Sequence, residues 1–345
     1  MIAPSAFLEP DRDTWRAGIA QMPAQRARTL AARAAAAPLF AHAYSFHLNF
    51  RFGGMMPVDL LDFAASHGLK GVKIHVEDGE ENSLLARPEL RHAFGERAAQ
   101  LGLEVHIEIS ETRPEALARL IEIAGATGAT SVRCYPRYEA RVSRIIATTI
   151  ADLRQLQTLD AGRALRVTLE QHEDLTSCEL VDIVRQVGDP NLSLLFDFGN
   201  MINAHERPLE ALRRQAAHIT EVHIKDCFVV PDRGGWAQMG CVSGTGHIPF
   251  ADLLVGLLLL GEERAQVTAF ALEEEVDYFA PAMRFPDEES DPLIGFRTAS
   301  LTDVAEADIA ARLIREKAEA TAQVATVRAL LAQIETAARD RALAS

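Results

Sequence analysis

Polar side chains that could bind a metal ion or move a proton follow four apolar runs in the second half of the chain. The runs read VTLEQHED, LLFDFGN, TEVHIKD and FALEEEVDY, and their polar residues are Glu170, His172, Asp197, Asn200, His223, Lys225, Asp226, Glu273, Glu274 and Glu275. Side chains alternate faces along a strand. The pairs two residues apart therefore share a face: Glu170 with His172, His223 with Lys225, and Glu273 with Glu275. If the four runs are parallel strands, these groups meet at one edge.

Such a collection of carboxylate and imidazole groups is typical of a divalent-cation site. Three carboxylates and one imidazole suit Mn²⁺, which we expect, with Mg²⁺, Co²⁺ or Zn²⁺ as alternatives. The cysteines Cys134, Cys178, Cys227 and Cys241 form no CxxC pair. They do not indicate a thiolate zinc site or a disulfide framework, and we interpret them as free thiols in a reducing compartment.

Eight short β-branched or apolar runs alternate with longer segments of helical spacing. The predicted strands are LFAHAYSFHL (39–48), GVKIHV (71–76), LEVHIEIS (103–110), TSVRCYP (130–136), LRVTLEQH (165–172), LSLLFDF (192–198), ITEVHIK (219–225) and VTAFALEEE (267–275). The segments between them, such as RPEALARLIEIAGATG, often end in a glycine C-cap. Repeated strand–helix units predict an α/β fold with a parallel sheet, and eight units close into a (β/α)8 TIM barrel.

The ends of the chain carry helical patterns outside this repeat. We expect an N-terminal helical extension over residues 1–38, the barrel over residues 39–302, and a C-terminal helix over residues 303–345. The apolar stripe of the last helix would pack on the barrel or on a partner subunit. The apolar run Leu253–Leu260 is too short to cross a bilayer and predicts a buried helix.

A doubly wound sheet is the alternative fold. Its dinucleotide-binding form carries a GxGxxG loop after the first strand. Here Phe52-Gly53-Gly54 is followed by Met55-Met56, so that loop is missing. The barrel is therefore favoured.

The order of the motifs resembles the xylose-isomerase-like TIM-barrel superfamily of sugar isomerases and epimerases. The matching motifs are E-x-H at 170–172, D-x-G-N at 197–200, H-x-K-D at 223–226, Gly244-Thr245-Gly246 before a short helix, and L-E at 272–273. The resemblance implies a metal ion bound by Glu170, Asp197, His223 and Glu273. It also implies that His172, Lys225 and Asp226 are neighbours of these ligands, and Glu170 and Glu273 would act as acid and base.

Residues around this quartet are candidates for substrate binding, each with a structural alternative. The candidates are His172, Lys225, Asn200, Asp226 and Arg133. Arg133 could hold an anionic group through a bidentate pair, or form a structural salt bridge. Carboxylates at strand ends can also be helix caps or solvated loop charges. The early-strand histidines His42, His47, His75 and His106 are expected in the core or in the pocket lining.

The sequence departs from the family pattern after the last strand. Three consecutive glutamates occupy 273–275; Glu273 directly follows the apolar run, Glu275 shares its face, and Glu274 should point the other way. The next segment, VDYFAPAMRFPDEESDPLIGFRTASLTD, is longer and more polar than barrel closure requires. Long βα loops commonly serve function or assembly.

These residues predict a metal-dependent isomerase or epimerase that acts on a small sugar or keto-sugar through an enediolate. The alternative is a lyase that acts on a 3-oxo sugar acid or a 3-keto glycoside. An apurinic endonuclease fits less well, because it needs more histidine ligands and a basic groove. A sugar-binding barrel without catalysis is the remaining option.

Charge and composition narrow the partners. The formal net charge of −14 disfavours a nucleic-acid backbone. The N-terminus MIAPSAFLEPDRD lacks the pattern of a signal peptide, so we expect a cytoplasmic protein that does not insert into a membrane. We expect a small sugar-like substrate and a homo-oligomer.

Overall fold

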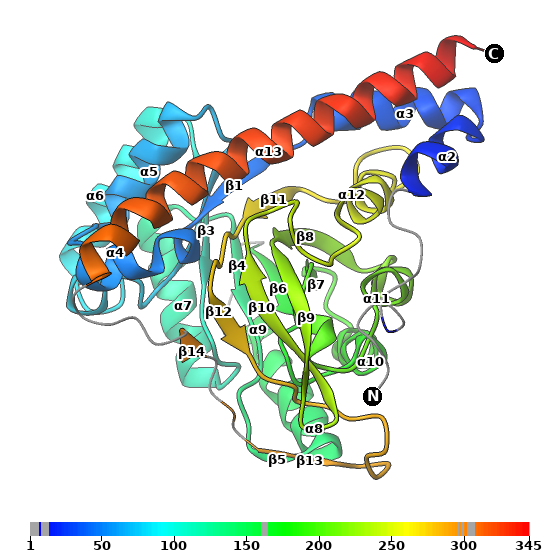
Figure 1. The fold of residues 1–345 in the computed structure, drawn as a ribbon. Coiled ribbons are helices and arrows are strands. Elements are labelled where there is room, and N and C mark those ends of the chain that lie inside the picture. The colour runs from blue at the N-terminus through cyan, green and yellow to red at the C-terminus, as the bar shows by residue number, and fades with distance from the viewer. Residues whose placement is uncertain are drawn as a thin grey trace.

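Eight parallel strands form a closed barrel in the computed structural model, which describes residues 7, 14–159, 165–295, 297, 300–301 and 308–344. The order around the barrel is β1-β11-β8-β7-β6-β4-β3-β2 (Figure 1). The strands are β1 (Leu39–His42), β2 (Gly71–His75), β3 (Glu104–Glu108), β4 (Ser131–Cys134), β6 (Arg166–Glu170), β7 (Leu192–Asp197), β8 (Ile219–Ile224) and β11 (Ala269–Leu272). The predicted TIM barrel is confirmed, and each predicted run contains one of these strands.

Helices connect the strands and cover the outside of the barrel. They are α4 (His47–Phe52), α5 (Pro57–Ser66), α6 (Pro88–Leu101), α7 (Pro114–Thr127), α8 (Val142–Leu153), α9 (Leu156–Leu159), α10 (Ser177–Val187), α11 (Pro208–Gln215), α12 (Phe250–Leu258) and α13 (Ile309–Leu343), with 3-10 turns η1 (Ala43–Phe46), η2 (Glu80–Asn82) and η3 (Asn200–Ile202). Gly102, Gly128 and Gly188 end α6, α7 and α10 in the left-handed conformation, as the C-cap signals indicated. The predicted buried helix in the run Leu253–Leu260 corresponds to α12. No helix in the described part of the chain is long and apolar enough to span a membrane.

The first strand is shorter than predicted. β1 ends at His42, and the residues that were expected to extend it form η1 and the start of α4. The imidazole of His42 accepts a hydrogen bond from the Tyr44 backbone N–H and starts the turn. Glu316 then accepts hydrogen bonds from the N–H groups of Leu48 and Asn49 at the beginning of α4. Both interactions depend on side chains whose positions a local strand pattern does not reveal.

Additional strands extend beyond the C-terminal ends of the barrel strands. β9 (Asp226–Asp232) and β10 (Gly235–Cys241) form an antiparallel hairpin directly after β8, and β12 (Tyr278–Ala280) and β14 (Ser300–Leu301) continue this sheet (Figure 1). β5 (Ala140–Arg141) pairs with β13 (Leu293–Ile294). Gly240 lies so close to the carbonyl of Glu275 that a side chain could not be accommodated. The long polar segment after the last barrel strand therefore contributes ordered strands beside the mouth.

The long C-terminal helix α13 packs against α3 (Ala24–Ala35), α2 (Thr14–Ala20) and α4. Figure 1 shows α13 running alongside α3 and extending beyond the barrel. Its apolar stripe is buried, and Gln323 donates a hydrogen bond to the carbonyl of Ile224 at the end of β8. The predicted helix at this end of the chain therefore packs on the barrel, while residues 303–307 and 345 of its predicted range lie outside the described residues.

The interior of the barrel is unusually polar. A small apolar cluster of Phe40, Ala269 and Ala271 lies within it, whereas barrel interiors are ordinarily filled by branched apolar side chains. Lys73, His106, Glu108, Ser131, Thr168 and Glu221 are all buried on the barrel strands. Buried charges need partners, so ion pairs inside the barrel form part of its core.

The contribution of α13 to stability can be tested with two isoleucines on the same helix. Ile334 is fully buried and Ile314 is 73% exposed. Ile334→Ala should lower the free energy of unfolding by about 2–5 kcal/mol because it leaves a cavity, and Ile314→Ala should change it by less than about 0.5 kcal/mol. Urea denaturation followed by circular dichroism measures both. Equal effects would contradict the observed orientation of the helix.

Candidate metal centre

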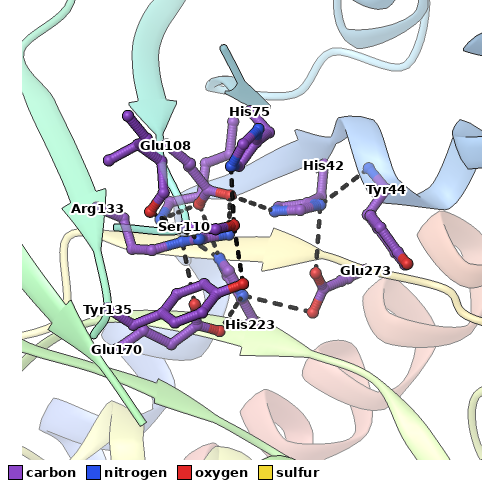
Figure 2. A network of polar contacts seen from close by, with 12 residues as sticks. His42, Tyr44, His75, Glu108, Ser110, Arg133, Tyr135, Glu170, His223 and Glu273 are labelled. Atoms are coloured by element: carbon purple, nitrogen blue, oxygen red, sulfur yellow. Dashed lines mark hydrogen bonds and ion pairs between the residues drawn. The ribbon is translucent and has the colours of Figure 1, made fainter. Parts of the chain in front are cut away.

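The four side chains proposed as metal ligands converge at the C-terminal mouth of the barrel. The Nδ1 atom of His223 lies 3.3 Å from Glu170 Oε1, 3.9 Å from Asp197 Oδ2 and 3.4 Å from Glu273 Oε2. All four side chains are buried. They come from the ends of β6, β7 and β8 and from the residue that follows β11, so the closure of the barrel brings them together around His223. Glu170, Asp197 and His223 form one group with the spacing of metal ligands, and Glu273 forms a second with His223 and His42. Figure 2 shows Glu170, His223 and Glu273.

The donor set fits a divalent cation. Among the described residues, one buried atom of each member has an ion-pair partner but no hydrogen bond of good geometry. Glu170 Oε2 lies 3.0 Å from Arg133 Nε, Asp197 Oδ2 lies 3.2 Å from Lys225 Nζ, and His223 Nδ1 lies 3.4 Å from Glu273 Oε2. Buried polar atoms are normally paired. Burial alone would lower the pKa of His223, yet Glu273, Glu108 and Glu170 raise it well above its usual value. The site therefore favours positive charge at Nδ1, and oxygen donors with one imidazole match Mn²⁺, Mg²⁺, Co²⁺ or Zn²⁺.

Glu108, at the end of β3, fixes the orientation of His223. Its Oε1 atom lies 3.1 Å from His223 Nε2 and 3.2 Å from Lys73 Nζ. Its Oε2 atom lies 3.0 Å from His42 Nε2 and 2.5 Å from Arg133 Nη2 (Figure 2). Burial would raise the pKa of Glu108, but Arg133 and the other surrounding cations lower it well below its usual value. Since the carboxylate only accepts, Nε2 of His223 carries a hydrogen and Nδ1 faces the other carboxylates.

His42 also lies close to the quartet, but its geometry gives it another role. Its Nδ1 atom is 3.5 Å from Glu273 Oε1 and accepts a hydrogen bond from the Tyr44 N–H. That nitrogen has one lone pair, which Tyr44 uses, and Nε2 donates to Glu108. His42 therefore orients Glu108, and it lies in the pocket lining as expected of an early-strand histidine.

The three consecutive glutamates point to different partners. Glu273 faces His223, while Glu274 accepts hydrogen bonds from the backbone N–H and the hydroxyl of Ser243. Glu275 lies 3.0 Å from Lys225 Nζ. Burial raises the pKa of Glu274 to about 7 and that of Glu275 to about 8. Of the three glutamates, Glu273 is therefore the one that contacts His223.

A cavity of about 460 Å³ opens above these groups and is lined by four of the five predicted substrate-binding residues: Arg133, His172, Asn200 and Lys225. The Nζ atom of Lys225 lies 3.2 Å from Asp197 Oδ2 and 3.0 Å from Asn200 Oδ1. Arg133 makes the salt bridges that were its structural alternative, to Glu108 and, through Nε at 3.0 Å, to Glu170. Lys225 and Arg133 therefore neutralise two of the proposed ligands.

His172 forms an aromatic wall with Tyr135. The two rings stack with centroids 3.9 Å apart and planes inclined by 14°. Burial lowers the pKa of His172 to about 3, so the ring is neutral near pH 7. A neutral imidazole at the cavity surface can exchange hydrogen bonds with a substrate.

Asp226, the fifth residue predicted to bind substrate, is absent from the lining of this cavity. Its carboxylate accepts hydrogen bonds from the backbone N–H groups of Gly244, Gly246, Ile248 and Cys227. A side chain on Gly246 would collide with this carboxylate. Asp226 therefore shapes the loop that precedes α12, and the Gly-Thr-Gly motif serves the same local structure.

Glu108, Lys73, Ser110 and Tyr135 were not singled out from the sequence, although a signal for some of them exists. In LEVHIEIS, residues 104, 106, 108 and 110 are polar and share one face of β3. Lys73 and His75 form the same pattern on β2. A polar face on a barrel strand indicates a polar barrel interior. The strand runs were interpreted as apolar, so this signal was not used.

The comparison with known proteins identifies a family through the central part of the chain. Residues 61–261 match the family described as xylose isomerase-like TIM barrel. The chain belongs to this family. It is 46% identical over 312 residues to the uncharacterized protein YihM of Escherichia coli (strain K12), covering 90% of this chain and 95% of YihM. It is also 22% identical over 160 residues to 3-oxo-isoapionate decarboxylase of Pectobacterium atrosepticum, covering 45% of this chain and 57% of the decarboxylase.

Solved structures of this family share the fold at low sequence identity. D-allulose 3-epimerase from Methylomonas sp. superposes with a TM-score of 0.52 at 16% identity, over 69% of this chain and 83% of the epimerase. A xylose isomerase-like TIM-barrel protein from Mycobacterium smegmatis in complex with magnesium gives a TM-score of 0.51 at 15% identity, over 83% of this chain and 97% of that protein.

The dependence of the centre on Glu108 can be measured through metal affinity. Glu108→Gln keeps the size of the side chain but removes the charge that four donors surround, so His223 loses the group that orients it. Mn²⁺ should bind about 10- to 100-fold more weakly, as when an outer-shell partner is lost. Isothermal titration calorimetry gives the affinity. Glu77→Gln, the same change at an exposed position of the cavity rim, is the control and should leave the affinity unchanged.

Metal binding should release protons. The surrounding carboxylates hold the pKa of His223 well above its usual value, so Nδ1 is protonated at neutral pH and must lose its proton to become a ligand. The affinity for Mn²⁺ should therefore increase as the pH rises from 6 to 8. Calorimetry in buffers with different ionisation enthalpies counts the protons, and a count of zero at pH 7 would contradict the assignment.

Proposed function

We propose that this protein is a divalent-metal-dependent isomerase or epimerase acting on a small sugar or keto-sugar. The observation that carries this proposal is the convergence of three buried carboxylates on Nδ1 of His223, beside a cavity of about 460 Å³ that Glu170 and Glu273 line. A cavity of this size can enclose a sugar-like molecule. Proteins similar to this chain include D-allulose 3-epimerase and 3-oxo-isoapionate decarboxylase.

Glu170, Asp197, His223 and Glu273 would hold the ion. Bound there, a divalent cation would polarise a substrate carbonyl and stabilise negative charge on its oxygen. Mn²⁺ is our first choice, with Mg²⁺, Co²⁺ and Zn²⁺ as alternatives. The magnesium complex of the Mycobacterium smegmatis protein supports a divalent ion in this fold.

The two glutamates would move protons on opposite sides of a substrate. Glu170 is the last residue of β6 and Glu273 directly follows β11, and β7 and β8 lie between these two strands in the barrel. One carboxylate can remove a proton and the other can return one, which inverts a carbon centre or shifts a carbonyl. Burial would raise the pKa of Glu170, but Arg133 and His223 lower it to about 2, so this carboxylate is ionised at neutral pH.

Lys225 would stabilise developing negative charge next to these groups. Its pKa stays well above the usual value despite burial, because Asp197, Glu275 and Glu273 surround it. It is therefore a permanent cation in the cavity lining. A fixed positive charge beside an oxygen that becomes negative lowers the barrier to enolisation.

A lyase that acts on a 3-oxo sugar acid or a 3-keto glycoside is the second candidate. The match to 3-oxo-isoapionate decarboxylase favours it specifically. The same donor set and the same Lys225 would stabilise the enolate that remains after CO₂ or a leaving group departs, so no other residue is required. An apurinic endonuclease is disfavoured by the net charge of −14.

Product analysis separates these reactions. Mn²⁺-loaded protein would be incubated in D₂O with ketoses, inosose-like polyols and 3-oxo sugar acids. Deuterium in an isomeric product, detected by NMR, would identify an isomerase or epimerase, and release of CO₂ or a leaving group would identify a lyase. Bound metal without turnover of any of these compounds would favour a binding protein.

The role of Glu170 can be tested by removing its charge. Glu170→Gln keeps one oxygen donor but cannot accept a proton, so turnover should fall by about 100- to 10,000-fold and metal affinity should weaken. Lys225→Met should lower activity while leaving the metal content intact, because a lysine cation is not a ligand. Metal analysis of both purified variants distinguishes them. Near-normal turnover of Glu170→Gln at saturating metal would transfer the proton-moving role to Glu273 or His172.

A further inference from the structure

One wall of the cavity is formed by side chains from the ends of β2, β3 and β4 that the proposed reaction does not use. His75, Ser110, Tyr135 and Arg137 all line the cavity, and Figure 2 shows the first three of them linked by hydrogen bonds. Ser110 lies two residues beyond Glu108 on the same face of the chain. It is therefore about 7 Å further toward the mouth than the carboxylate that orients His223.

The hydrogen bonds along this wall run in one direction. Nη1 of Arg137 donates to the Tyr135 hydroxyl oxygen at 3.2 Å, because a guanidinium has donors only. The Tyr135 hydroxyl donates in turn to Ser110 Oγ at 2.8 Å. The oxygen of Ser110 thus receives one hydrogen from the Tyr135 side.

His75 supplies the second hydrogen. Its Nδ1 atom accepts a hydrogen bond from the backbone N–H of Glu77 at 3.2 Å. Burial lowers the pKa of His75 to about 3, so the ring is neutral and its one hydrogen is on Nε2. That atom lies 2.9 Å from Ser110 Oγ and donates to it.

Ser110 is therefore left as a donor. A hydroxyl oxygen accepts two hydrogen bonds, and His75 and Tyr135 provide both. Across the described residues, no protein oxygen or nitrogen accepts the hydrogen of Ser110 itself. The hydroxyl is partly exposed on the cavity wall, so its hydrogen is directed toward whatever occupies the cavity.

The charge of this wall favours an anionic acceptor. Arg137 is a permanent cation that lines the cavity beside Tyr135. Three acids lie near this wall. Glu77 has a largely exposed carboxylate, and Asp78 uses its carboxylate to accept a hydrogen bond from the His75 backbone N–H. Glu173 interacts with Arg137, but burial raises the pKa of Glu173 to about 7, so its negative charge is incomplete at neutral pH. Hydrogen bonds to charged acceptors are stronger than those to neutral ones.

We infer that the substrate carries an oxyanion, a carboxylate or a phosphate, that binds this wall through the Ser110 hydroxyl and the charge of Arg137 while its other end reaches the metal centre. This inference rests on the proposed function, because it places a sugar-like substrate in the cavity above the four donors. It deepens that proposal by assigning the substrate class: a sugar with an acidic group several carbons away from the reacting carbonyl.

Three probes that share one end test the inference. D-Gluconate, D-glucarate and 6-phospho-D-gluconate carry the same carboxylate at carbon 1 and differ at carbon 6 by a hydroxyl, a carboxylate and a phosphate. Calorimetry with Mn²⁺-loaded protein should show glucarate or the phosphate binding at least about 10-fold more tightly than gluconate. A preference for glucarate would identify a carboxylate substrate, and a preference for 6-phosphogluconate would identify a sugar phosphate.

Two variants link that preference to the wall. Ser110→Ala and Arg137→Gln should each reduce the preference about 10-fold, while the affinity for Mn²⁺ and for gluconate stays unchanged. Ser66→Ala, at an exposed serine on α5, is the matched control. Equal affinity of all three probes, absence of binding by all three, or a preference that survives in both variants would overturn the inference.

The comparison would also be made without metal, so that the two proposals fail separately. Failure of the wild-type protein to bind Mn²⁺ would contradict the proposed function alone, and the wall should still favour the two probes with an anionic group at carbon 6 over gluconate. Normal Mn²⁺ binding with no preference among the probes would contradict the oxyanion subsite alone.

Discussion

The geometry of the mouth depends on one buried carboxylate. Glu108 is fully buried and receives His42 from β1, Lys73 from β2, Arg133 from β4 and His223 from β8. A carboxylate without partners is costly in such an environment. The four donors can reach it only when the barrel is closed, since β1 and β8 are separated from β3 around the ring. The orientation of His223 by Glu108 therefore depends on closure of the barrel.

The charges below this carboxylate are balanced within the barrel. Lys73 Nζ lies 2.8 Å from Glu221 Oε2 as well as 3.2 Å from Glu108. His106 Nδ1 lies 3.3 Å from the same Glu221 oxygen. Lys73 and Arg133 offset Glu108 and Glu221, two cations against two anions. Arg133 also pairs with Glu170, Lys225 pairs with Asp197, and the raised pKa of His223 keeps a positive charge beside Glu273. A bound divalent cation would replace the proton of His223. A polar core of this kind holds side chains in fixed positions, which favours pre-organisation of a site.

The sequence predicted the barrel and the place of the site because both depend on local patterns. Apolar runs alternating with helical segments located all eight strands, and polar residues at strand ends located the quartet that meets at His223. Pairing between distant side chains was not predictable in this way. Glu108 was visible as a polar residue of β3, but its partners come from four strands. The early end of β1 similarly depends on Glu316, which is remote in sequence. For Asp226, the family motif suggested a place beside the metal ligands, whereas its carboxylate binds the backbone of the loop before α12.

The C-terminal helix connects the two halves of the mouth. Arg312 and Arg315 at the start of α13 each bind the carboxylate of Asp277, which lies in the left-handed region with φ of 65°. This conformation disfavours a residue other than glycine, so the two cations help to hold the turn. The turn lies directly between Glu275, the partner of Lys225, and β12. Glu316, one turn along the helix, fixes the first residues of α4 next to the cavity. Movement of this helix would therefore displace both Lys225's partner and the segment that follows His42, which makes the helix a structural part of the site.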